Sequence, residues 1–186
     1  MLHFTPIATK ADIRQILTLQ AINLASNITP KQIAEQGFLT VQHDQALLQR
    51  MNELEQGIII KHGSDIAGYI LAMSKELRHD IPILIPMFNI FDELNYDGKR
   101  LDQYRYIVVG QVCIAEEYRG RGTFDQAYQA YKALLSPKYD FAITEISSRN
   151  LRSIRAHQRV GFEFIHEFEA PDGENWQIVI WDWHHS

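Results

Sequence analysis

The 186-residue sequence contains a single cysteine, Cys113. One cysteine excludes an intrachain disulfide and a cysteine metal cluster. Cys113 lies within the apolar run 109–114, which favours a buried strand residue over a nucleophile. Two adjacent histidines, His184 and His185, have no further residues that would complete a metal site, so we expect no metal.

Long apolar runs and an excess of positive charge are also missing. No stretch approaches the roughly 18 apolar residues of a membrane span, and the N-terminal segment lacks the basic start and apolar core of a secretory signal. The net charge is −5, which gives no general attraction to nucleic acid or to an anionic membrane. We therefore expect a cytoplasmic protein with no nucleic-acid or membrane partner, although one local basic patch remains. Its members are Arg149, Arg152, Arg155 and Arg159.

Length and composition predict one ordered domain, residues 1–186, because 46% apolar residues suffice for a packed core and 22% charged residues argue against disorder. Apolar periodicity then predicts the elements along the chain. The expected strands are 4–8, 57–61, 66–73, 104–114, 141–147, 162–168 and 176–183, and the expected helices are 11–24, 30–36, 43–55, 122–135 and 150–160. The connection 74–103 is too long for a simple turn. Its acidic and aromatic residues suit a cationic acceptor, but an ordinary helix with its apolar side on the core is the favoured interpretation.

A glycine-rich loop, 118–124 with the sequence YRGRGTF, stands between the apolar run 106–114 and a helical pattern from 125 to 135. Glycines allow successive backbone N–H groups to face one anion, and the positive end of the following helix adds its dipole. The loop lacks the Lys-Ser/Thr of a P-loop and the G-x-G-x-x-G of a dinucleotide fold. The order of strand, glycine loop and helix predicts a cradle for a pyrophosphate, with a plain polar turn as the alternative.

A second segment, 150–162, ends a helical pattern in Gly161-Phe162. Gly161 is well placed as a left-handed C-cap, and Phe162 then opens a strand. Combined with the R-x-x-G of Arg119 and Gly122, this segment resembles the coenzyme A motifs of the GNAT superfamily of N-acetyltransferases. The family pattern is Gln/Arg-x-x-Gly-x-Gly/Ala in the loop, and Asn, a small residue, often Tyr, and Gly-Phe in the second segment.

Two positions depart from that pattern. Phe124 stands where the family usually has Gly or Ala, and His157 stands where it often has Tyr. Asn150 and Ser153 match the second segment. The small residue normally lets the helix approach the pyrophosphate closely, whereas a phenylalanine there could pack beneath the loop.

The resemblance implies a mixed α/β (α+β) fold, with a mostly antiparallel sheet of about seven strands that is flanked by helices and splayed at the fourth and fifth strands. It also implies acetyl-CoA as co-substrate, with pantetheine amides pairing along the strand 106–114, loop amides holding the pyrophosphate, and Asn150 lining the pantetheine. The basic patch would suit a coenzyme with three phosphate groups. The implied coenzyme-binding residues are Val112, Cys113, Ile114, Arg119, Gly120, Arg121, Gly122, Thr123, Phe124 and Asn150.

Two residues are candidates for the catalysis of acyl transfer to an amine. At the family's tyrosine position, His157 could protonate the leaving thiolate, or it could be a helix-surface histidine without a chemical role. Glu145, in the strand 141–147, could be the general base, but strand alternation leaves its orientation open, and a structural role is the alternative. Gln111 could position an amine or a water but cannot act as a base.

We therefore expect an acyl-CoA-dependent N-acyltransferase, most simply acetyl transfer to a primary amine of a small molecule or a protein by direct attack. An acyl-CoA-binding sensor or structural module with little turnover is the alternative. A domain that binds another nucleotide is a third interpretation, which predicts an all-parallel sheet. Three tryptophans in the strand 176–183, which we expect at the sheet edge, could complete the core or form a homodimer contact.

Overall fold

The computed structural model describes residues 1–184, so the expectation for the His184-His185 pair falls partly outside the described residues. Its main sheet has seven strands in the order β1-β2-β3-β6-β7-β9-β8. Neighbouring strands are antiparallel except for the parallel pair β6 and β7. The strands are β1 (Leu2–Pro6), β2 (Ile58–His62), β3 (Asp65–Met73), β6 (Tyr106–Ile114), β7 (Phe141–Ser147), β8 (Glu163–Glu169) and β9 (Asn175–Asp182).

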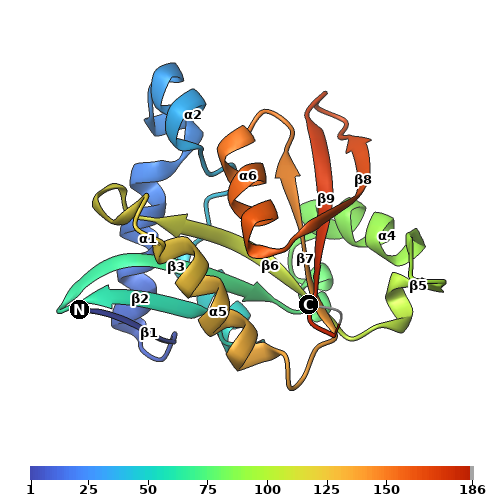
Figure 1. Ribbon diagram of the computed structural model, residues 1–186, viewed down its shortest axis with the longest axis horizontal. Coiled ribbons are helices and arrows are strands. Elements are labelled where there is room, and N and C mark those ends of the chain that lie inside the picture. The colour runs from blue at the N-terminus through green and yellow to red at the C-terminus, as the bar shows by residue number, and fades with distance from the viewer. Residues whose placement is uncertain (185–186) are drawn as a thin grey trace.

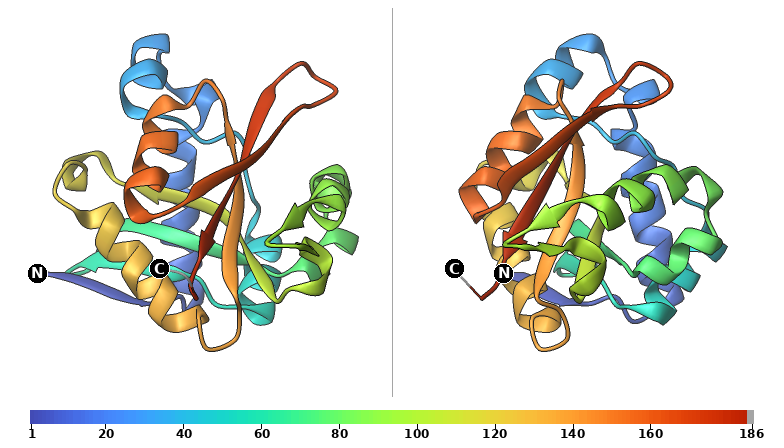
Figure 2. Two further views of the ribbon diagram at one scale, coloured as in Figure 1. Left: turned by 45° about the vertical axis from the view of Figure 1, so that its right-hand side comes forward. Right: turned by 90° about the vertical axis from the view of Figure 1, so that its right-hand side faces the viewer.

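Helices cover both faces of this sheet (Figures 1 and 2). One face packs against α5 and α6, and the opposite face packs against α1, α3 and α4. The short helix α2 lies beyond the sheet, beside α6. The helices are α1 (Lys10–Asn23), α2 (Pro30–Gln36), α3 (Gln45–Leu54), α4 (Ile85–Glu93), α5 (Thr123–Leu135) and α6 (Leu151–Val160). No helix in the described part of the chain is long and apolar enough to cross a membrane.

The predicted fold class is confirmed: the sheet is mixed, mostly antiparallel and seven-stranded, and its fourth and fifth strands in chain order are the parallel pair. The all-parallel alternative is wrong. The expectation that the last strand forms an edge is also wrong, because β9 inserts between β7 and β8 and pairs with both. Trp181 and Trp183 are consequently buried against α5 and complete the core.

The connection 74–103 contains helix α4 and a small hairpin of β4 (Asn95–Tyr96) and β5 (Lys99–Arg100), with short 3-10 turns around them. Phe88 and Phe91 are fully buried, and Arg78 forms an ion pair with Asp92. The helix favoured from the sequence is therefore present with its apolar side on the core. The β4–β5 hairpin was not predicted, because its strands have only two residues each.

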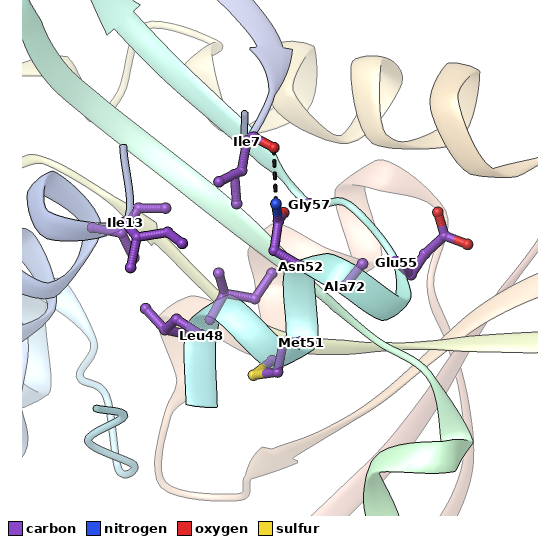
Figure 3. A pocket seen from close by; sticks show the side chains of 10 residues that line it. Ile7, Ile13, Leu48, Met51, Asn52, Glu55, Gly57 and Ala72 are labelled. Atoms are coloured by element: carbon purple, nitrogen blue, oxygen red, sulfur yellow. Dashed lines mark hydrogen bonds between the residues drawn. The ribbon is translucent and has the colours of Figure 1, made fainter. Parts of the chain in front are cut away.

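The core between α3 and the sheet is closely packed. The space that remains there is a cavity of about 10 Å³, lined by side chains that include Ile7, Ile13, Leu48 and Met51 (Figure 3). Asn52 closes one side of it by donating a hydrogen bond to the Ile7 carbonyl at 3.0 Å. Such a volume has room for about one water molecule, so this cavity is not a ligand site.

Helix α1 is fixed to the sheet through its first turn. Thr9 and Asp12 form a reciprocal capping box, and the Lys61 ammonium of β2 pairs with the buried Asp12 carboxylate. Burial raises the pKa of Asp12, but hydrogen bonds from Lys61 and from the N–H groups of Ala8 and Thr9 outweigh it, so the pKa lies below its usual value. This cluster sets the position of α1, whose far end reaches the site described below.

We predict that Asp12→Ala lowers the free energy of unfolding by about 1–3 kcal/mol at pH 7, because a buried capping and ion-pairing group is lost. The pKa of Asp12 is lower in the folded than in the unfolded chain. Its contribution to the free energy of unfolding is therefore fully present above the unfolded-state pKa and is lost as pH falls through the folded-state pKa. Urea unfolding at pH 7 and pH 2.5 measures both effects. Glu53→Ala, at an exposed position of α3, is the control, and equal losses for the two variants would contradict the prediction.

Candidate functional site

The site begins where the parallel strands β6 and β7 separate. Their pairing covers three positions, from Tyr106 opposite Phe141 to Val108 opposite Ile143. At the next position the Thr144 hydroxyl donates to the Val109 carbonyl at 3.0 Å, so a side chain replaces the backbone ladder. Beyond this point β6 has no strand partner on the side of β7, which leaves main-chain groups for a ligand.

A cleft of about 680 Å³ lies beyond the separation, within the size range of small-molecule and cofactor sites. Its walls come from the end of β6, the glycine-rich loop with the start of α5, one side of α6, and a segment near α2. The lining residues are Asn23, Gly37, Phe38, Leu39, Val112, Cys113, Ile114, Arg119, Gly120, Gly122, Thr123, Phe124, Asp125, Asn150, Leu151, Arg152, Ser153, Arg155, Ala156 and Arg159.

The N-terminus of α5 opens into this cleft without a side-chain cap. Its N-cap residue, Gly122, is left-handed with φ of 75°, and Gly120 is also left-handed at 71°. A residue with a side chain would be strained at either position. Thr9, Thr29 and Asn150, by contrast, cap their helices with side-chain oxygens. The first-turn N–H groups of α5 have no partner within the helix, so this end suits an anion.

The side chain of Arg119, the arginine of the loop motif, is held by hydrogen bonds to two other parts of the chain. Its Nε donates to the Ile114 carbonyl at 2.7 Å, and a terminal nitrogen donates to Asn23 Oδ1 at 2.6 Å. The guanidinium therefore ties the end of β6 to the end of α1, on the wall of the cleft. Such an arginine positions the loop. The main-chain N–H groups of Tyr118 and Arg119 donate to Ala115 and Glu116, and those from Gly120 onward remain available to a ligand.

The structure brings together all but one of the coenzyme-binding residues expected from the sequence. Arg121 is exposed in the same loop but does not line the cleft. Asn150 caps α6 by accepting from the Ser153 N–H, and its Nδ2 donates to the Phe38 carbonyl at 3.2 Å. That these residues bind a coenzyme stays a prediction.

Sequence reasoning missed one wall of the cleft, which we call the wall segment (Gly37–Leu39). Leu39 is hydrogen-bonded through its main chain to Asn23 and Ala25, at 3.0 and 2.9 Å. Gly37 is left-handed with φ of 74°, and a Cβ there would lie 2.8 Å from Asn150 Oδ1. The glycine is therefore needed for both its conformation and its close approach. Gly37 was the one local signal, and no periodicity pointed from it to α6.

His157 is buried on the α5 side of the sheet and does not line the cleft. Its Nδ1 lies 2.8 Å from the Ser153 carbonyl, so Nδ1 carries the proton, and Nε2 accepts from the Tyr128 hydroxyl at 2.7 Å. Burial lowers the pKa of His157 to about 4, against a smaller opposing effect of the Ser153 carbonyl. In this arrangement neither ring nitrogen presents a proton to the cleft.

Phe124 lies between His157 and the cleft. Its ring lines the cleft and contacts the His157 ring edge to face, with centroids 5.2 Å apart, and the Tyr128 ring at 4.9 Å. The two positions at which the sequence departs from the family pattern are thus in contact. Phe124 is larger than the Gly or Ala of the family pattern, and the His157 ring is smaller than the Tyr that the pattern often has.

Glu145 lies on the opposite face of the sheet from His157. It alternates with Thr144 and Ile146 and shares its phase with Ile143, which packs on the α1 and α4 side. The carboxylate is half-buried, and its buried Oε2 has no hydrogen-bond partner among the described residues. Burial raises the pKa of Glu145 to about 7. It does not line the cleft, so the structure does not bring the two predicted catalytic residues together.

Gln111 belongs to a buried polar network beneath β6. The main-chain N–H of His43 donates to Gln20 Oε1. The side-chain Nε2 of Gln20 then donates to Gln111 Oε1 at 2.7 Å and to the ring Nδ1 of His43 at 2.8 Å. The Tyr69 hydroxyl also donates to Gln111 Oε1, and Gln111 Nε2 donates to the Val41 carbonyl. Burial lowers the pKa of His43 to about 4. The network fixes the chain before α3 to α1 and β6, and Gln111 is not placed on the cleft wall.

No protein-family model matches the sequence, and no curated protein matches it. Solved structures do match. An N-acetyltransferase from Escherichia coli that acts on an alanine of a ribosomal protein has a TM-score of 0.62 at 10% identity, covering 98% of this chain and 94% of that chain. A GNAT-family acetyltransferase from Streptococcus agalactiae has a TM-score of 0.63 at 16% identity, covering 97% and 95%.

A third similar structure, a putative acetyltransferase from Salmonella typhimurium, was determined with its cofactor acetyl-CoA. Its TM-score is 0.59 at 16% identity, and the match covers 97% of this chain and 93% of that chain. Identities this low establish the fold alone. The chain therefore has the fold of the GNAT superfamily of N-acetyltransferases, as the resemblance of its two motifs predicted.

We predict that the Cys113 thiol is unreactive in the folded protein. Cys113 is buried, and burial raises its pKa to about 12, against a smaller opposing effect of Arg119. Since the thiolate is the reactive form, Ellman's reagent at pH 8 should react slowly until guanidinium unfolds the chain. Rapid reaction of one thiol per folded chain would contradict this.

We also predict that stability falls below pH 6.5. The folded-state pKa values of His43 and His157 are lowered to about 4, so the unfolded chain takes up protons first as pH falls from 6.5 to 4. The loss should be of order 3 kcal/mol for a fully buried histidine. Urea midpoints measured from pH 7.5 to 4.5 should show a smaller slope for His157→Gln than for the wild type. The exposed control His79→Gln should keep the wild-type slope, and an unchanged slope in His157→Gln would rule the prediction out.

Proposed function

We propose that this protein is an acyl-CoA-dependent N-acyltransferase that transfers an acyl group, most simply acetyl, from acetyl-CoA to a primary amine. The acceptor is an amine of a small molecule or of a protein. The E. coli protein with a similar structure acts on an alanine of a ribosomal protein. This supports a protein acceptor but does not decide between a protein and a small molecule.

One observation carries the proposal: a long cleft joins a free strand edge to an uncapped helix N-terminus. The end of β6 offers main-chain donors and acceptors, which suit the amides of pantetheine. The glycine loop and first turn of α5 offer N–H groups and a positive dipole, which suit a pyrophosphate. Coenzyme A carries these two groups in this order, with the thioester at the pantetheine end.

In the proposed reaction the amine nitrogen attacks the thioester carbonyl, a C–N bond forms, and the C–S bond breaks. The amine loses one proton and the coenzyme thiolate gains one. Glu145 lies outside the cleft and therefore accepts the proton through water rather than directly, and its pKa of about 7 is close to the working pH of a general base. Its unpartnered buried oxygen is free for this task.

The role of His157 as the acid stays a prediction. To act, its ring would exchange its hydrogen bonds to Ser153 and Tyr128 for one toward the cleft, past Phe124. Tyr128, whose hydroxyl already bonds His157, lies even deeper in the core. Protonation of the thiolate by solvent is the alternative in this geometry.

The first test is calorimetric titration with acetyl-CoA, coenzyme A and NAD, followed by a thiol-release assay over a panel of amines and peptides. We expect binding of the two coenzyme A species, no binding of NAD, and thiol release with some acceptors. Absence of coenzyme A binding would overturn the proposal. Binding without turnover on any acceptor would instead favour an acyl-CoA sensor.

We predict that Glu145→Gln lowers kcat by about 10²–10⁴-fold, as expected for loss of a general base. Wild-type turnover should rise with pH through about 7 and then level off, because the base must be deprotonated, and the variant should lose this dependence. Folding should survive, since a raised carboxyl pKa means that the charged form destabilises the folded state at high pH.

The matched control is Glu169→Gln, an exposed glutamate of β8. It should keep the wild-type rate and pH profile. An unchanged profile in Glu145→Gln would remove this residue from the mechanism while leaving the transferase proposal intact.

A further inference from the structure

The basic patch seen in the sequence divides into parts with different surroundings. Arg149 does not line the cleft: its guanidinium pairs with Glu174 at 2.7 Å and lies 5.8 Å from the centroid of the Phe38 ring. Arg152, Arg155 and Arg159 line the cleft from α6. Their spacing of three and four residues places them on one side of the helix.

Arg159 is engaged at the cradle. Its guanidinium clamps Asp125 in the first turn of α5, with Nε 3.1 and 3.0 Å from the two carboxylate oxygens and a terminal nitrogen at 2.7 Å. An acidic residue there would repel a pyrophosphate. The pairing with Arg159 removes that repulsion and also holds the last turn of α6 against the first turn of α5.

Arg155 differs from both neighbours. It is exposed on the cleft wall and forms no ion pair or hydrogen bond with the residues whose side chains the structure describes. It lies four residues before Arg159, which is about 6 Å along the helix axis at 1.5 Å per residue. A free guanidinium thus stands about one helical turn from the anion cradle of α5.

Coenzyme A carries a second anionic group near its pyrophosphate. The ribose that bears the pyrophosphate on its 5′ oxygen bears a phosphate monoester on its 3′ oxygen, so the width of one sugar ring separates the two. Guanidinium groups match phosphate oxygens through paired N–H donors. The cleft is lined by four arginines and one aspartate, although the whole chain has a net charge of −5.

We propose that Arg155 forms a second anion subsite that binds the 3′-phosphate of the coenzyme. The subsite rests on the proposed function, because it presupposes a pyrophosphate at α5. The subsite makes ligand binding specific for the 3′-phosphate: the protein binds coenzyme A more tightly than dephospho-coenzyme A, which lacks only this phosphate.

The experiment is a calorimetric comparison of coenzyme A with dephospho-coenzyme A on the wild type and on Arg155→Gln. We expect the wild type to bind coenzyme A about tenfold or more tightly than dephospho-coenzyme A, as for one charge-assisted phosphate contact. Arg155→Gln should weaken coenzyme A binding by a similar factor and leave dephospho-coenzyme A within about twofold. Arg155→Lys should recover part of the difference, because the charge remains without the paired donors.

Arg14→Gln, an exposed arginine of α1 away from the cleft, is the matched control and should bind both ligands as the wild type does. Equal wild-type affinities for the two ligands would overturn the subsite and leave the transferase proposal standing. So would an equal loss of both affinities in Arg155→Gln, which would mean a general electrostatic effect. If the wild type binds neither ligand, the proposed function fails and the subsite fails with it.

Discussion

The early end of the pairing between β6 and β7 is the constraint on which the site depends. Three residue pairs hold the strands together at one end, and the Thr144 hydroxyl then satisfies the Val109 carbonyl that a longer ladder would have paired. A buried carbonyl without a partner costs about 1–3 kcal/mol, so this bond makes the separation stable. The free edge of β6 on the cleft wall follows from strands that part at this point. The antiparallel partners on either side, β3 and β9, keep the two halves of the sheet in place.

The departures from the family motif belong to one local adjustment. Phe124, in the first turn of α5, contacts the His157 ring edge to face, and His157 hydrogen-bonds to Tyr128 and the α6 main chain. Phe124 has a large side chain where the pattern has Gly or Ala, and the imidazole of His157 has a smaller volume than the phenol of the tyrosine in the pattern. Compensating volumes of this kind are what a close-packed interior requires when one position changes. The cost is that the histidine becomes part of the core, with its protons committed to protein partners.

Local features of the sequence predicted most of the fold and one side of the site. The loop glycines Gly120 and Gly122 and the C-cap Gly161 act on residues close to them in the chain, so the sequence alone predicted them. The wall segment was not, because its position depends on a bond between Asn150 and Phe38, 112 residues apart. The edge position expected for the last strand was wrong for a similar reason. Alternation of apolar and polar residues predicts which side chains of a strand share a face of the sheet, but it does not predict which strands lie beside it. The phase of Glu145 likewise needed the packing of Ile143 and Ile146 around it.

The hydrogen bonds that hold the wall segment all use its main chain. Leu39 bonds to α1 and its continuation through its own N–H and carbonyl, and Phe38 offers its carbonyl to Asn150. No side chain of these two residues takes part in those bonds, although both line the cleft. Leu39 is in addition buried in the core, whereas the half-buried Phe38 can change in size without losing the main-chain hydrogen bonds that hold the segment. A single substitution at residue 38 would therefore alter the shape of the cleft at this wall and leave the walls formed by β6, α5 and α6 in place.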